Sequence, residues 1–173
     1  MDLRTEILKE HSKQQCRLIV QWVGNSAERF AQLFHLFLQG ENLVVQRAAW
    51  PLSYCVEAHP NLILPHLGKL LKYLQQPGLH NTVKRNGTRL LQYVAIPQRY
   101  RGKVMHICFG FLESPKEAVA VKVFALTVLV HLARHHPEIV PEIKLLIEAQ
   151  LPQQTAAFKS RVKNLMPVLS TIQ

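Results

Sequence analysis

The sequence predicts an all-α fold in which repeated helix pairs stack on one another as a solenoid. A short block that opens with an apolar residue recurs at steps of 38, 38 and 37 residues, and its four copies begin at Val45, Val83, Val121 and Phe158. A helix-breaking residue precedes each copy, at Gly40, Pro77, Pro115 and Pro152. One such repeat cannot bury its apolar face alone, so neighbouring repeats must cover each other.

Apolar spacing and Pro/Gly punctuation predict an N-terminal cap helix that ends at Gly24, followed by four helix pairs. The expected pairs are 27–39 with 43–58, 61–76 with 80–95, 97–113 with 117–135, and 138–151 with 155–171. Proline follows the second helices at Pro60, Pro97 and Pro137, where it disfavours helical geometry in the residue before it. No linker interrupts the pattern, so residues 1–173 are expected to form a single domain.

The second helices show which side is buried. In 80–95 the residues at helical spacing, from Val83 through Gly87 to Val94, form the expected buried stripe. Ala49, Gly87 and Ala125 are small at one equivalent position, which predicts a close approach of neighbouring helices. The helix 117–135 is apolar almost all round, so either its own neighbours or a second subunit, in a homodimer, must cover it.

The repeats resemble the HEAT-like repeat family, with armadillo repeats as close relatives. The resemblance covers nearly the whole chain and rests on segments such as Val45 to Ala49, where an apolar residue is followed by Arg and then by small residues. It implies a right-handed superhelix whose second helices line a concave surface. The chain departs from the family in one respect: Asp2 is its only aspartate, which puts the family's ladder of Asp to Arg contacts between repeats in doubt.

The charge of the chain predicts an acidic partner. The formal net charge is +10, and no acidic residue lies between Glu57 and Glu113. We expect a basic concave face that binds an acidic macromolecule, either nucleic acid or acidic protein, unless this face is merely solvated. The basic residues assigned to that face are Lys84, Arg85, Arg89, Lys122, Lys159, Arg99, Arg101 and Lys103.

Aromatic residues could add to that surface. Trp50 and Tyr54 are candidate apolar anchors for a protein partner, although Trp50 equally suits the core. Tyr93 and Tyr100 could stack on bases of a nucleic acid, or they could be packing residues.

No pattern for catalysis, metal or cofactor is convincing. His131 and His135 lie four residues apart with His136 adjacent, but no third ligand has zinc-site spacing. Serines lack nucleophile-elbow glycines and no Gly-rich phosphate loop is present. The three cysteines, Cys16, Cys55 and Cys108, are widely spaced and expected to be reduced thiols. We therefore expect a protein that is not an enzyme and has no catalytic residue, metal or cofactor.

The same features predict a cytoplasmic protein without a membrane partner. Residues 1–10 read as an amphipathic helix rather than as a signal peptide. The longest nearly uncharged run, 123–133, is too short for a membrane span, which takes about 20 residues.

One enzymatic alternative follows from the family resemblance. DNA glycosylases that remove alkylated bases are similar basic HEAT-like repeats, and they depend on a carboxylate near the lesion. Here Glu57, two turns after Trp50, is the available acid, and the central basic region has none. The resemblance leaves this reading as the alternative to a noncatalytic scaffold.

Overall fold

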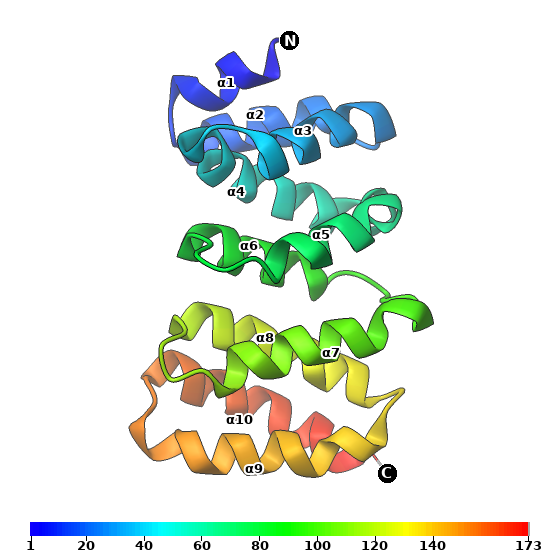
Figure 1. Cartoon of the computed structure of the whole chain (residues 1–173), viewed down its shortest axis with the longest axis vertical. Helices are drawn as coiled ribbons and strands as arrows, with labels where there is room; N and C mark the ends of the chain where they lie inside the picture. The colour runs from blue at the N-terminus through cyan, green and yellow to red at the C-terminus, as the bar shows by residue number, and fades with distance from the viewer. Residues whose placement is uncertain (173) are drawn as a thin grey trace. The chain divides into compact units, whose positions relative to one another are not determined.

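The structure, a computed structural model, describes residues 1–172 and is helical throughout (Figure 1). Those residues form ten α-helices and three short 3-10 helices, and they contain no strand. The predicted all-α class of a helical repeat solenoid is confirmed. The chain divides into two compact units, Met1–Ala95 and Ile96–Gln173, which we call the first and the second unit.

The first unit pairs short first helices with longer second helices. Its elements are α1 (Leu3–Lys9), α2 (Lys13–Val23), α3 (Ala27–Gln39), α4 (Asn42–Ala58), η1 (Pro60–His66), α5 (Leu67–Leu74) and α6 (Asn81–Leu91). The central element is α4, which packs against α1, α2, α3 and α6. The second helices α2, α4 and α6 therefore form one layer, with α4 in its middle.

The N-terminal segment differs from the prediction, because it folds as two helices rather than one cap helix. The chain is extended at Glu10 and Ser12, and α2 starts afresh at Lys13. Ser12 caps α2 by accepting a hydrogen bond from the backbone N–H of Gln15 at 3.0 Å. The Ser12 to Gln15 spacing is that of a capping box, a local start signal that apolar periodicity alone does not reveal.

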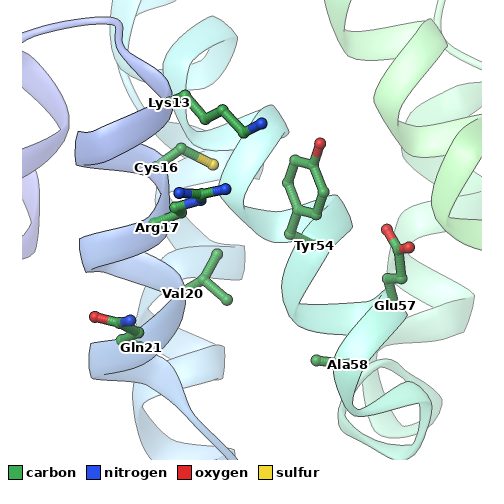
Figure 2. Close-up of a pocket in the computed structure, with 8 residues that line it drawn as sticks. All are labelled: Lys13, Cys16, Arg17, Val20, Gln21, Tyr54, Glu57 and Ala58. Atoms are coloured by element: carbon green, nitrogen blue, oxygen red, sulfur yellow. The ribbon is translucent and has the colours of Figure 1, made fainter.

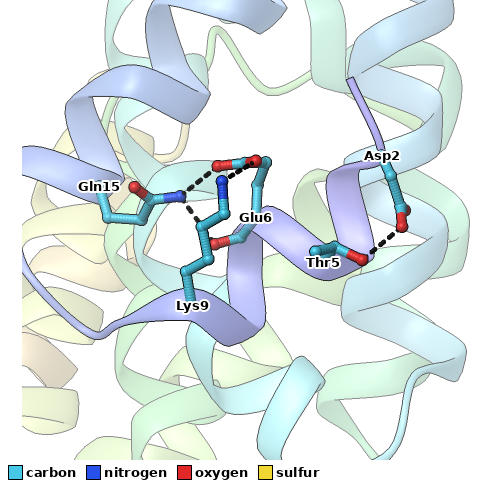
Figure 3. A network of polar contacts seen from close by, with 5 residues as sticks. All are labelled: Asp2, Thr5, Glu6, Lys9 and Gln15. Atoms are coloured by element: carbon cyan, nitrogen blue, oxygen red, sulfur yellow. Dashed lines mark hydrogen bonds and ion pairs between the residues drawn. The ribbon is translucent and has the colours of Figure 1, made fainter.

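A polar network fastens α1 to α2 (Figure 3). The buried amide of Gln15 donates to the backbone carbonyl and to the carboxylate of Glu6, both at 2.8 Å. Lys9 pairs with the same carboxylate, and Thr5 donates to Asp2 at the start of α1. The hydrogen bonds from Lys9 and Gln15 lower the pKa of Glu6. The two Gln15 bonds therefore join α1 to α2 as a helix pair.

Aromatic rings fill the space between the first helices of this unit. Phe30, Phe34 and Phe37 of α3 are buried, and the ring of His66 lies 4.8 Å from that of Phe34 and 5.8 Å from that of Phe30. Tyr73 of α5 meets the edge of Phe37 at 5.4 Å. Burial lowers the pKa of His66, and the nearby Lys69 lowers it further.

The predicted period holds in space. Val45, Val83, Val121 and Phe158 are all buried near the start of their second helices. The expected close contact at Gly87 is also confirmed, because a Cβ atom built there would lie 2.8 Å from Cδ2 of Leu74. The absence of a side chain at Gly87 thus leaves space for Leu74 of α5.

The second unit is organised around one buried helix. Its elements are α7 (Gln98–Glu113), α8 (Val119–Ala133), η2 (Pro137–Ile139), α9 (Val140–Gln150), η3 (Leu151–Gln153) and α10 (Ala156–Thr171). The apolar helix α8 packs against α7, α9 and α10, so its own neighbours provide the predicted cover.

Prolines explain two of the places where the observed helix bounds differ from the expected ones. The expected helix 61–76 begins instead with the 3-10 turn η1, which contains Pro60 and Pro65, before α5 starts at Leu67. The expected helix 138–151 is likewise preceded by the 3-10 turn η2, whose first residue is Pro137, before α9 starts at Val140. The end of 80–95 tightens after Leu91, since the N–H groups of Gln92 to Val94 bond three residues back. Proline lacks an N–H donor, so Pro65 and Pro141 cannot bond four residues back, and the first turns of these two segments are not regular α-helix. The tightened end after Leu91 contains no proline.

Candidate functional site

A groove of about 530 Å³ runs between α2 and α4 on the second-helix layer of the first unit (Figure 2). We call it the α2–α4 groove. Its lining residues are Lys13, Cys16, Arg17, Val20, Gln21, Tyr54, Glu57 and Ala58. All of them come from α2 or α4, so the groove belongs entirely to the first unit.

The α2 wall is amphipathic. Cys16, Ile19 and Val23 face the core, whereas Lys13, Arg17 and Gln21 are exposed and recur every fourth residue. Residues four apart share one side of a helix, so the two cations form a row along the groove. No acidic residue occurs in α2, which leaves this wall positively charged.

The floor of the groove is apolar. Val20 and the sulfur of Cys16 face the ring of Tyr54, and Lys13 and Arg17 extend from α2 toward that ring (Figure 2). Ala58 continues the floor one turn beyond Tyr54 on α4. A cationic wall beside an apolar floor suits a ligand that carries both acidic and apolar groups.

Arg89 of α6 fixes the α4 wall. Its guanidinium donates to the Glu57 carboxylate at 2.9 Å and to the Ser53 hydroxyl at 3.2 Å, and its Cζ atom lies 4.4 Å from the centre of the Tyr54 ring. The Arg89 side chain is only 18% exposed, while that of Glu57 is 40% exposed. Glu57 therefore reaches the groove with one carboxylate oxygen bound by Arg89 and with its side chain partly exposed.

The thiols do not supply a nucleophile to the groove. Burial raises the pKa of Cys16 to about 11 and that of its neighbour Cys55 to about 12. Both side chains are protonated at neutral pH and pack as small apolar groups. The buried Cys108 thiol in the second unit is raised to about 12 in the same way.

The basic residues predicted to bind an anionic partner divide between the units. Lys84, Arg85 and Arg89 lie in the first unit, and Arg99, Arg101, Lys103, Lys122 and Lys159 lie in the second. The exposed side chains among them are Arg85, Arg99, Lys103 and Lys159, whereas Lys84, Arg89 and Arg101 are half-buried.

Lys122 departs from its predicted place on an exposed face. It is 4% exposed, and its Nζ donates to Oε1 of Gln150 at 2.9 Å. Gln150 in turn donates to the backbone carbonyl of Leu112 and accepts from Gln154, so the lysine belongs to an internal network of the second unit. Burial lowers its pKa. Gln150, at the end of α9, covers the Lys122 side chain. The sequence of α8 alone does not show that this lysine is buried.

Several arginines bind atoms within their own unit. Arg101 donates to the carbonyl of Ile96 at 3.2 Å, and the Arg99 guanidinium lies 4.8 Å from the Tyr100 ring centre. Arg47 of α4 donates to the carbonyl of Leu8 at 2.8 Å. Arg161 of α10 donates to Thr127 of α8 at the same distance.

Together with Arg89, these contacts replace the aspartate ladder that the sequence lacks. Arg47, Arg89 and Arg161 each reach back to an earlier helix pair. Arg47 donates to a backbone carbonyl, Arg89 donates to a hydroxyl and a carboxylate, and Arg161 donates to a hydroxyl. Successive repeats can therefore be joined through arginine without an aspartate partner.

The two candidate anchors have different surroundings. Tyr54 lines the groove, whereas half-buried Trp50 lies one turn earlier with its ring 6.3 Å from that of Tyr54. The ring of His11 also lies beside Trp50, with the ring centres 5.3 Å apart. Trp50 therefore lies outside the groove, beside Tyr54.

Sequence reasoning missed Lys13 and Arg17. Residues 11–27 contain no acid and carry this pair of cations one helical turn apart, a signal that the longer acid-free stretch after Glu57 overshadowed. In the second unit, Lys159 lines a shallower groove of about 490 Å³ with Leu151, Pro152, Val162 and Lys163. Lys163 is a further exposed cation outside the predicted set.

The three histidines of the predicted group differ in exposure, and His136 is half-buried. His131 and His135 are exposed, and Nδ1 of His136 lies 3.0 Å from a Glu138 carboxylate oxygen. Within residues 1–172, no group of three or more His, Cys, Asp or Glu side chains has an arrangement that could hold a metal ion.

A family model described as a HEAT repeat domain matches residues 3–169. No curated protein and no solved structure matches the chain significantly. Over the residues that the structure describes, every helix is too short or too polar to cross a membrane.

Proposed function

We propose, since this chain belongs to the HEAT repeat domain family, that it is a noncatalytic scaffold that binds an acidic segment of another protein. The α2–α4 groove supports this proposal. It places Lys13 and Arg17 beside an apolar floor large enough to accept side chains of a partner. Helical repeats of this kind present extended surfaces to macromolecular partners.

An acidic protein suits the groove better than nucleic acid does. Phosphate recognition needs a series of cations that follow a backbone, and it gains little from an apolar floor. Of the cations assigned to that role, Arg89, Arg101 and Lys122 donate to acceptors within their own units. A segment with carboxylates and apolar side chains would use both parts of the groove.

Charge reversal at Arg17 tests this proposal. The probe is a short fluorescent peptide in which glutamates surround leucines, titrated by fluorescence anisotropy at low salt. Arg17→Glu is expected to weaken binding about tenfold, equivalent to about 1.4 kcal/mol. Lys72→Glu, at an exposed lysine of α5, reverses a charge outside the groove and should leave the affinity unchanged.

Two outcomes contradict the proposal. One is equal weakening by Arg17→Glu and Lys72→Glu, which would reduce the binding to net charge. The other is the absence of peptide binding while duplex DNA binds, which would make nucleic acid the partner.

The noncatalytic part of the proposal has its own support and test. Glu57 is the acid that a base-removing enzyme would need, and its carboxylate is bound by Arg89 at 2.9 Å. Electrostatic stabilisation of a cationic sugar would require an available carboxylate. We expect no base release when the protein is incubated with alkylated duplex DNA. Release that disappears in Glu57→Gln would establish the enzymatic alternative.

A further inference from the structure

We infer that the α2–α4 groove selects a helical partner segment with an apolar stripe and two acidic residues. The two acidic residues are one turn apart, and both lie along the same edge of the stripe. This inference rests on the proposed function and specifies the chemistry of the partner. It follows from the spacing of the cations, the shape of the floor and the charge at the opposite wall.

The cations set the spacing of the acids. Lys13 and Arg17 are four residues apart on α2, so their positions along the helix axis differ by about 6 Å. Both are exposed, and within residues 1–172 neither forms an ion pair with a carboxylate. Acidic residues four apart on a partner helix have the same spacing, so both cations can be paired at once.

The floor suits the apolar stripe of a helix. Cys16 and Val20 are four residues apart on α2, and Tyr54 and Ala58 are four residues apart on α4. The two rows border a space of about 530 Å³, within the range of pockets that bind small ligands. An amphipathic helix presents its apolar residues at the same interval, which is how helices dock in grooves.

Glu57 makes the groove asymmetric. Its carboxylate lies on the α4 side of the groove, beyond the Tyr54 ring as seen from Lys13 and Arg17 (Figure 2). Arg89 of α6 holds it there. An acidic residue on the α4 flank of a partner would meet this carboxylate, whereas one on the α2 flank would meet a cation. The acids of the partner must therefore lie on one flank.

Peptide isomers of identical composition test this arrangement. The first carries two glutamates four positions apart on one flank of a leucine stripe. The second places the glutamates two positions apart, on different sides of the helix, and the third places one glutamate on each flank of the stripe. All have blocked ends and an alanine-rich helical background, and binding is measured by anisotropy at low salt.

The first isomer is expected to bind about tenfold more tightly than the other two. Arg17→Glu should abolish this preference, and Lys72→Glu should preserve it. Glu57→Gln should improve binding of the third isomer relative to the first. Circular dichroism and thermal melting of each variant establish that it remains folded.

Equal affinity for the three isomers would overturn the inference, and the proposed function would stand if Arg17→Glu still weakened them all. Tighter binding of the second isomer would also overturn it, in favour of an extended segment. Failure of every peptide to bind, together with binding of duplex DNA, would overturn the proposed function itself.

Discussion

Arg89 of α6 covers the ring of Tyr54 of α4, with its Cζ atom 4.4 Å from the ring centre, while its Nη2 atom lies 2.9 Å from Oε2 of Glu57. One arginine thus holds both the aromatic and the acidic part of the groove wall. Because the pairing is partly screened from water, the three side chains should be energetically coupled.

A double-mutant cycle measures this coupling. We expect Arg89→Met and Glu57→Gln to show an interaction energy of about 0.5–1 kcal/mol in denaturant unfolding. Arg85→Met, at an exposed arginine of the same helix, should show no coupling to Glu57→Gln. Strictly additive effects for Arg89 and Glu57 would mean that the ion pair contributes nothing to the α4 wall.

Gly87 should tolerate alanine but not leucine. The built Cβ atom at Gly87 meets the end of the Leu74 side chain at 2.8 Å, a contact that a small shift of Leu74 can relieve. Alanine also gains about 1 kcal/mol of helix propensity, so Gly87→Ala should be close to neutral. Gly87→Leu should lower the free energy of unfolding by about 1–3 kcal/mol through overpacking.

Gly110 provides the matched control in α7, because a Cβ atom built there has no atom of another helix within 4 Å. Gly110→Ala is expected to stabilise the protein by about 0.5–1 kcal/mol. An unchanged melting temperature for Gly87→Leu would contradict the close contact between α5 and α6.

Lys122 and Gln150 should respond differently to replacement. Gln150→Leu removes the acceptor of a buried ammonium and is expected to destabilise by about 1–3 kcal/mol in thermal or denaturant unfolding. Lys122→Met removes the buried charge while keeping much of the volume, and Gln150 retains its bonds to Leu112 and Gln154. This variant should be neutral or more stable. A larger loss of unfolding free energy for Lys122→Met than for Gln150→Leu would contradict this prediction.

His66 should make the stability of the protein sensitive to mild acid. Its pKa is lower in the folded chain than the ordinary value of 6.5, mainly because of burial. The unfolded chain therefore binds more protons in the interval between the two pKa values, and stability falls as the pH drops below about 6.5. His66→Phe keeps an aromatic ring beside Phe34 and should flatten this part of the stability curve. The free energy of unfolding, measured with urea at several pH values in this range, would depend on pH equally in both proteins if His66 had no role.

The sequence by itself determined the helices and their period. Local signals such as Gly40, Pro97 and Pro115 mark where helices end. Val83 is buried and Gly87 lies at a close helix contact because each repeat packs on the next in the same way. The expectation of one domain over residues 1–173 stays a prediction, as does a partner for the basic residues.

The tertiary structure decided which charges reach a common surface. Lys13 and Tyr54 lie 41 residues apart in the sequence and meet only because α2 packs against α4. Lys122 looks like any cation of a second helix until Gln150 of α9 covers it. Helix propensity and apolar spacing act over a few residues, so a sequence can reveal them. The exposure and pairing of a long cationic side chain depend on neighbouring helices, whose packing brings distant residues together.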